Sequence, residues 1–128
     1  MSQPPPLDKT ALYKVTNAET GIVIAARVRV ADTPQSRSIG LLNRASLDPD
    51  EALLITQCSS IHTFFMKFPI DVLYLDREYR VVRVVSNLVP SRLSFCLLKA
   101  SQVLELKAGA LASKGKLAGS LLKFEKQA

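Results

Sequence analysis

Short apolar runs, separated by turn-forming residues, recur along the whole chain. In the run at residues 22–30, Val28 and Val30 alternate with Arg27 and Arg29, which is the period-two pattern of a strand with one buried and one solvated face. A strand satisfies its backbone polar groups only by pairing, so this pattern requires a sheet. The predicted strands are 13–16, 22–30, 52–55, 72–75, 81–85, 103–106 and 121–124.

Two segments predict short helices. Thr33 is a good N-cap and Pro34 suits the first helical position, and apolar residues follow at helical spacing, which predicts a helix over 34–42. A second short helix is predicted over 109–114. Because strands outnumber helices and short turns join most neighbours, we expect an α+β fold. It would be a mainly antiparallel curved β-sheet or barrel-like sandwich with two short helices.

The length of 128 residues and the 48% hydrophobic content are typical of one domain with its own core. Three consecutive prolines predict a flexible arm over residues 1–6, so we expect the domain to span 7–128. The sequence has no secretory leader and no uncharged run of about 18 residues, so we expect a cytoplasmic protein without a transmembrane segment. In that compartment Cys58 and Cys96 would be reduced thiols. The net charge of +6 makes the chain basic and allows an acidic partner.

The segment 58–76 is the densest in chemistry-bearing residues, with the only His, one of two Cys and three of five Phe. It contains His62-Thr63, then Met66-Lys67-Phe68-Pro69-Ile70-Asp71. Upstream stands Ser36-Arg37-Ser38-Ile39-Gly40-Leu41-Leu42-Asn43-Arg44, and downstream Val103-Leu104-Glu105-Leu106-Lys107-Ala108-Gly109. In this order the elements resemble the family called domain of unknown function 192.

That resemblance implies a compact α+β domain around a curved antiparallel sheet or barrel, and it implies no established activity. The sequence departs from the family pattern in two places. Phe65-Met66 stands where the family commonly has Gly-Met or Trp-Met, and Gly119-Ser120 stands where a Gly-Asp pair is common.

Three residues are candidates for catalysis. His62 suits a general base, a metal ligand or a hydrogen-bonded loop anchor. Asp71, where the loop enters a strand, would accept backbone N–H groups or pair with Arg37 or Arg44. Cys58 with His62 would form a nucleophile pair, but nothing in the sequence supplies an oxyanion hole. Zinc would also need Cys96 and Asp71, so we expect no metal and no cofactor.

Our leading hypothesis is a non-enzymatic binding or accessory domain with a pocket formed by the first helix and the His62–Asp71 loop. The predicted binding residues are Arg37, Arg44, His62, Thr63, Met66, Lys67 and Asp71. Its partner would be a small anionic ligand or a protein. One alternative is a hydrolase or transferase that uses His62 and Asp71 on an anionic substrate. A second is weak nucleic-acid binding through scattered Arg and Lys, which we do not expect because the basic residues form no stripe.

Overall fold

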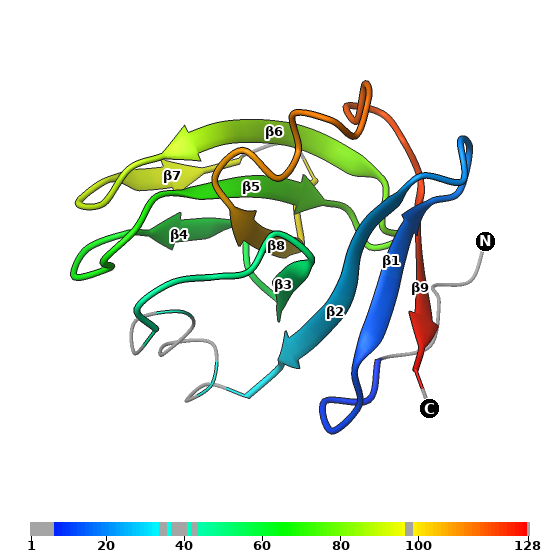
Figure 1. The fold of residues 1–128 in the computed structure, drawn as a ribbon, viewed down its shortest axis with the longest axis horizontal. Helices are drawn as coiled ribbons and strands as arrows, with labels where there is room; N and C mark the ends of the chain where they lie inside the picture. The colour runs from blue at the N-terminus through cyan, green and yellow to red at the C-terminus, as the bar shows by residue number, and fades with distance from the viewer. Residues whose placement is uncertain (1–6, 34–35, 37–40, 42–43, 97–98, 128) are drawn as a thin grey trace.

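The computed structural model describes residues 7–33, 36, 41, 44–96 and 99–127. These described residues contain nine strands, coloured in chain order in Figure 1. They are β1 (Tyr13–Asn17), β2 (Val23–Ala31), β3 (Glu51–Thr56), β4 (Ser60–His62), β5 (Ile70–Leu75), β6 (Val81–Leu88), β7 (Leu93–Phe95), β8 (Gln102–Lys107) and β9 (Leu122–Lys126).

Seven strands form one sheet in the order β6-β5-β8-β3-β2-β1-β9. Neighbouring strands run antiparallel except β2 and β3, which are parallel. A parallel pair requires a crossover connection, and residues 32–50, part of which lie outside the described ones, separate β2 from β3 in the sequence. By contrast, β1 and β2 are joined by a short turn at Gly21, which has a φ of 78°.

The sheet curls until its two outermost strands meet at one end. Arg80 and Leu121 form an isolated antiparallel bridge. Next to it the Val81 amide donates to the Ser120 carbonyl at 2.8 Å and the Leu122 amide donates to the Tyr79 carbonyl at 3.0 Å. These bonds protect part of the edges of β6 and β9, and they make the sheet barrel-like at this end.

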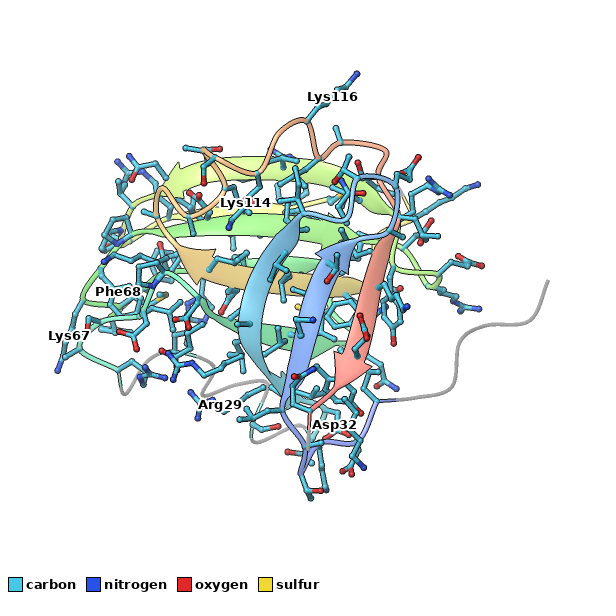
Figure 2. All side chains as sticks on the ribbon, turned by 45° about the vertical axis from the view of Figure 1, so that its right-hand side comes forward. Arg29, Asp32, Lys67, Phe68, Lys114 and Lys116 are labelled. Atoms are coloured by element: carbon cyan, nitrogen blue, oxygen red, sulfur yellow. The ribbon has the colours of Figure 1, made fainter. Side chains whose placement is uncertain are left out.

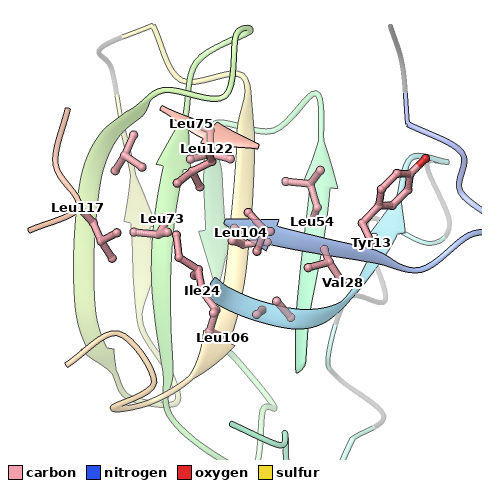
Figure 3. Close-up of a cluster of buried hydrophobic side chains, with 14 of the residues drawn as sticks. Tyr13, Ile24, Val28, Leu54, Leu73, Leu75, Leu104, Leu106, Leu117 and Leu122 are labelled. Atoms are coloured by element: carbon pink, nitrogen blue, oxygen red, sulfur yellow. The ribbon is translucent and has the colours of Figure 1, made fainter. Parts of the chain in front are cut away.

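Alternate residues of the central strands β5 and β8 belong to two separate apolar clusters. Leu73 of β5 and Leu104 of β8 belong to the first cluster, which fills the inside of the curl (Figure 3). Val72 and Val103, one residue earlier on each strand, belong to the second cluster on the opposite face. This period-two division explains why β5 is buried along its whole length, since both of its faces are covered.

A small two-stranded sheet, β4 with β7, covers part of the second face. β4 pairs antiparallel with β7, with Ile61 opposite Ser94 and His62 opposite Leu93. Ile61 and Ser94 are buried, and the Tyr74 hydroxyl in β5 donates to the Ser94 hydroxyl at 2.8 Å. Leu93 points outward and is 65% exposed. This small sheet therefore has one face on the main sheet and one face in solvent.

The expected α+β class is wrong, because the strands and turns of the described residues include no helix. Residues 109–114, predicted as a helix, form turns: the Ala112 amide donates to the Gly109 carbonyl and the Lys114 amide to the Leu111 carbonyl. The predicted helix over 34–42 falls largely on residues that lie outside the described ones, as does the predicted arm over 1–6. No described helix is long and apolar enough to cross a membrane.

Candidate functional site

Thr63 joins two loops that are far apart in the sequence. It is fully buried, and its hydroxyl donates to the Val89 carbonyl at 2.6 Å and accepts from the Arg92 amide at 2.9 Å. Its own amide donates to the Arg92 carbonyl at 2.8 Å, and its carbonyl accepts from the Ser91 amide at 3.0 Å. These four bonds fix the loop after β4 against the loop between β6 and β7.

Large hydrophobic side chains are exposed around this junction. Phe64 and Phe65 follow Thr63 directly, and the His62 ring stacks on Phe64 with ring centres 5.3 Å apart. Val89 lies in the facing loop, and Leu93 and Phe95 lie on the outer side of β7. We call these five hydrophobic residues the aromatic surface: Phe64 (43% exposed), Phe65 (88%), Val89 (36%), Leu93 (65%) and Phe95 (50%).

Phe65 is the most exposed member and has an unfavourable backbone conformation. The Met66 amide donates to the Thr63 carbonyl at 3.2 Å, which closes a turn with Phe64 and Phe65 at its apex. Phe65 has a φ of 66°, a region that Gly and Asn adopt more easily than an aromatic residue. Neither packing nor backbone geometry therefore favours a phenylalanine at this position.

The charged residues in the two segments that build the aromatic surface are all cationic. The segments 57–70 and 82–101 contain no Asp or Glu, and they contain Lys67, Arg83, Arg92 and Lys99, all exposed. The Arg83 guanidinium donates to the Phe95 carbonyl and lies 5.9 Å from the centre of the Tyr74 ring. These two contacts hold the Arg83 side chain beside β7. The two segments that build the aromatic surface therefore carry exposed cations and no acidic side chain.

The next two residues of the loop point in different directions, Met66 into the core and Lys67 into solvent. Met66 is 7% exposed and packs in the second apolar cluster, whereas Lys67 is exposed. Figure 2 places Lys67 and Phe68 at one end of the molecule. Four predicted binding residues, His62, Thr63, Met66 and Lys67, therefore meet in this loop, but only His62 and Lys67 face solvent.

Asp71 lies apart from His62. Its carboxylate accepts the amides of Asn87 at 2.9 Å, Gly109 at 3.0 Å and Leu111 at 3.1 Å, and the residue is 2% exposed. Leu111 belongs to the first cluster, whereas the small β4–β7 sheet that carries His62 covers the second. The sheet therefore separates the two side chains that the enzyme hypothesis needs together.

Arg44 pairs with a different carboxylate from the one predicted. Its guanidinium makes two 2.9 Å bonds to Glu51, which raise the pKa of Arg44 and lower that of Glu51, and Arg29 lies 3.7 Å from the same carboxylate. The predicted ion pair between Arg44 and Asp71 is therefore not formed. Arg37 lies outside the described residues.

The Cys58 thiol is bonded to the backbone at the start of β4. Its thiol donates to the Ser60 carbonyl at 2.9 Å, and neither Cys58 nor Cys96 forms a disulfide. Cys58 lines an open cavity of about 660 Å³ together with Asp32, Arg77 and Ser101. Within the described part of the chain, no three His, Cys, Asp or Glu side chains are grouped as a metal would need.

Sequence reasoning missed one feature of the site and one of the main sheet. The first is the contribution of β7, because Leu93-Ser94-Phe95 is too short to be recognised as a strand. The second is Glu105, a charged residue between Leu104 and Leu106 in β8, which is 4% exposed and accepts no hydrogen bond from a described residue. Burial raises the pKa of Glu105 to about 7. The interruption of an apolar strand by one acid was the available signal.

Two solved structures share the fold. A candidate transcription regulator from Sinorhizobium meliloti 1021 matches with a TM-score of 0.78 at 22% identity, over 89% of this chain and 92% of that one. A protein of unknown function from Novosphingobium aromaticivorans DSM 12444 matches with a TM-score of 0.72 at 20% identity, over 88% and 83%. At these identities the likeness concerns the fold alone.

No curated protein matches the chain. A family model does, across residues 14–124, and its description reads "Uncharacterized ACR". This range includes all the elements that carried the resemblance in the sequence. The chain belongs to the domain of unknown function 192 family (DUF192).

Proposed function

We propose that this chain is a non-enzymatic binding domain that contacts its partner through the aromatic surface. The observation that carries the proposal is Phe65, which is 88% exposed at a φ of 66°. A residue that costs the fold backbone energy and returns no packing is explained by a contact outside the chain. The neighbouring hydrophobic side chains would extend that contact along β7.

The pocket of our sequence hypothesis changes in character under this proposal. Its loop side becomes an exposed surface built from the His62–Asp71 loop and β7. Its other side was to be the helix over 34–42, most of which lies outside the described residues. Among the predicted binding residues, His62 and Lys67 would contact the partner, while Thr63 and Met66 would position the loop.

The enzyme alternative has weaker support. It required His62 as base and Asp71 as its orienting acid, and these lie on opposite sides of the sheet. The Asp71 carboxylate is already engaged by three backbone amides. Nucleic-acid binding, our second alternative, has the cations and aromatics of the surface in its favour and becomes one outcome of the experiment below.

Site-specific photo-crosslinking tests the proposal without knowledge of the partner. A benzophenone amino acid replaces Phe65 in one variant and Leu12 in another, since Leu12 is an exposed hydrophobic residue (42%) outside the aromatic surface. Both full-length variants are irradiated in the cells that express them. We expect adducts at position 65 that are absent at position 12, and mass spectrometry then identifies them as protein, lipid, nucleic acid or small molecule.

The same experiment has an outcome that contradicts the proposal. If positions 65 and 12 give the same adducts, or if neither gives any, the aromatic surface is not a binding surface. A third variant with the probe at Phe95, which is 50% exposed on β7, shows how far the contact extends along this strand.

A further inference from the structure

We propose that the aromatic surface docks on an anionic lipid bilayer, with the Phe64-Phe65 turn inserted among the headgroups and the surrounding cations on the lipid phosphates. This inference rests on the proposed binding function and names its partner. It would make the protein a peripheral membrane binder that uses a loop in place of an amphipathic helix.

The shape of the turn favours a bilayer over a protein partner. Phe65 is 88% exposed at the apex of a tight turn, so it protrudes from the surface. A protein partner would need a cavity that matches this side chain, whereas the bilayer interface accepts a protruding aromatic ring without a preformed cavity. Phe64, at 43% exposed, lies directly behind it.

The charges around the turn complement an anionic surface. Lys67 follows Phe65 by two residues, and Arg92 is held to Thr63 by backbone bonds at the base of the turn. No acidic residue occurs in either of the two segments that build this region, 57–70 and 82–101. Cations next to exposed aromatics supply the electrostatic and hydrophobic contributions that stable membrane attachment needs together.

The position of the loops lets them reach a planar membrane. The loop between β4 and β5 and the loop between β6 and β7 lie at the same end of the longest axis, at the left of Figure 1, whereas β9 lies toward the other end. Lys67 is at this end as well (Figure 2). A flat surface can therefore touch both loops at once.

The loops are also rigid before binding. The four bonds of Thr63 hold the turn against the facing loop, and Met66 anchors its far side in the second apolar cluster. Little conformational entropy is then lost when the turn inserts. This rigidity distinguishes the turn from an exposed hydrophobic loop that would collapse onto its own domain.

Vesicle co-sedimentation of the full chain tests the inference. The probes are vesicles of pure phosphatidylcholine and vesicles that contain about 30% phosphatidylserine. We expect the wild type to partition onto the anionic vesicles and hardly onto the neutral ones, and to dissociate as salt rises from about 0.1 M to about 0.5 M. Phe65→Ser should lower the partition coefficient roughly tenfold or more, because a phenylalanine side chain leaves the apolar phase.

Matched variants separate the lipid contact from general effects. Leu12→Ser removes an exposed hydrophobic side chain elsewhere and should leave partitioning unchanged. The pair Lys67→Glu with Arg92→Glu should weaken binding by about tenfold or more. The pair Lys116→Glu with Lys123→Glu changes the net charge equally at exposed sites outside the aromatic surface and should weaken it much less.

Three results would overturn the inference. These are no preference for anionic vesicles, equal partitioning of Phe65→Ser and Leu12→Ser, or equal partitioning of the two charge-reversal pairs. None of them decides the proposed function, because the photo-crosslinking at position 65 is independent. A protein or nucleic-acid adduct at position 65, without vesicle binding, would support the proposed binding function and would show that its partner is not a lipid bilayer.

Discussion

The hydroxyl of Thr63 donates to the carbonyl of Val89 across 26 residues of sequence, at a distance of 2.6 Å. The same oxygen accepts the Arg92 amide at 2.9 Å. One buried hydroxyl thereby satisfies two backbone groups of the loop between β6 and β7. The arrangement of the aromatic surface depends on this contact, because Phe64 and Val89 belong to the two loops that it joins.

Thr63→Val should lower the free energy of unfolding by about 1 to 3 kcal/mol, since it removes the hydroxyl that serves a partly buried carbonyl and a partly buried amide while keeping the side-chain shape. Chemical denaturation measures the change. Thr56→Val is the control, because its hydroxyl makes a single long bond of 3.5 Å to the Ala31 carbonyl. An equal loss in both variants would contradict the special role of Thr63.

The main sheet was largely predictable because its strands are long enough to show their pattern. The runs 22–30 and 72–75 have β-branched and apolar residues in the alternating or continuous arrangement that buried strands require, and β2 and β5 lie there. β4 and β7 have three residues each, and their pairing depends on the distant contacts of Thr63. No local pattern reveals such a contact.

The predicted second helix failed for an identifiable reason. The Asp71 carboxylate binds the amides of Gly109 and Leu111, which are two residues apart, and this holds the chain in a turn. Gly109 and Gly115 have φ values of 90° and 76°, and both lie outside the helical region. Tertiary contact thus overrode the helix propensity of the intervening Ala and Leu residues.

The candidate site remains a prediction in position, and its composition differs from the one expected. The density of rare residues in 58–76 led to a functional hypothesis for this loop, which contains Phe64 and Phe65. The partners assigned to it were wrong in part, because Arg44 finds Glu51 and Asp71 faces the other side of the sheet. Which distant charges form ion pairs depends on the topology of the sheet, and no local sequence pattern reveals that topology.

Asp71→Asn should lower the free energy of unfolding by about 1 to 3 kcal/mol, because an amide accepts the three backbone N–H groups less well than a carboxylate does. Hydrogen exchange should quicken at Gly109 and Leu111. Asp76→Asn is the control, since Asp76 accepts the amides of Glu78 and Arg80 at an exposed turn. Unchanged exchange at Gly109 would show that Asp71 does not hold this loop.

Glu105 should make the fold less stable as pH rises. Burial raises its pKa from 4.5 to about 7, so between these values the unfolded chain loses a proton that the folded chain keeps. Stability is therefore greatest below pH 4.5 with respect to this group, falls through the window and levels off above pH 7. A rise of the pKa from 4.5 to about 7 corresponds to about 3 kcal/mol of stability lost across this window.

Glu105→Gln should remove this part of the pH dependence, and Glu125→Gln, at an exposed position of β9, should leave it intact. Denaturation curves at pH 5 and pH 8 measure both. If the difference between the two pH values is the same in wild type and Glu105→Gln, the Glu105 carboxyl is not the group that titrates.

Phe65→Asn should stabilise the fold while it abolishes binding. Asparagine adopts a φ of 66° at lower cost than phenylalanine, and the ring it replaces is 88% exposed, so the free energy of unfolding should rise by about 0.5 to 1 kcal/mol. Phe95→Asn is the control, because Phe95 lies in an extended strand where asparagine is disfavoured and no gain is expected. Denaturation measures stability, and photo-crosslinking from Phe95 or vesicle partitioning measures binding. A Phe65→Asn variant that is less stable than the wild type would mean that Phe65 serves the fold, and the argument that it is kept for a partner would fail.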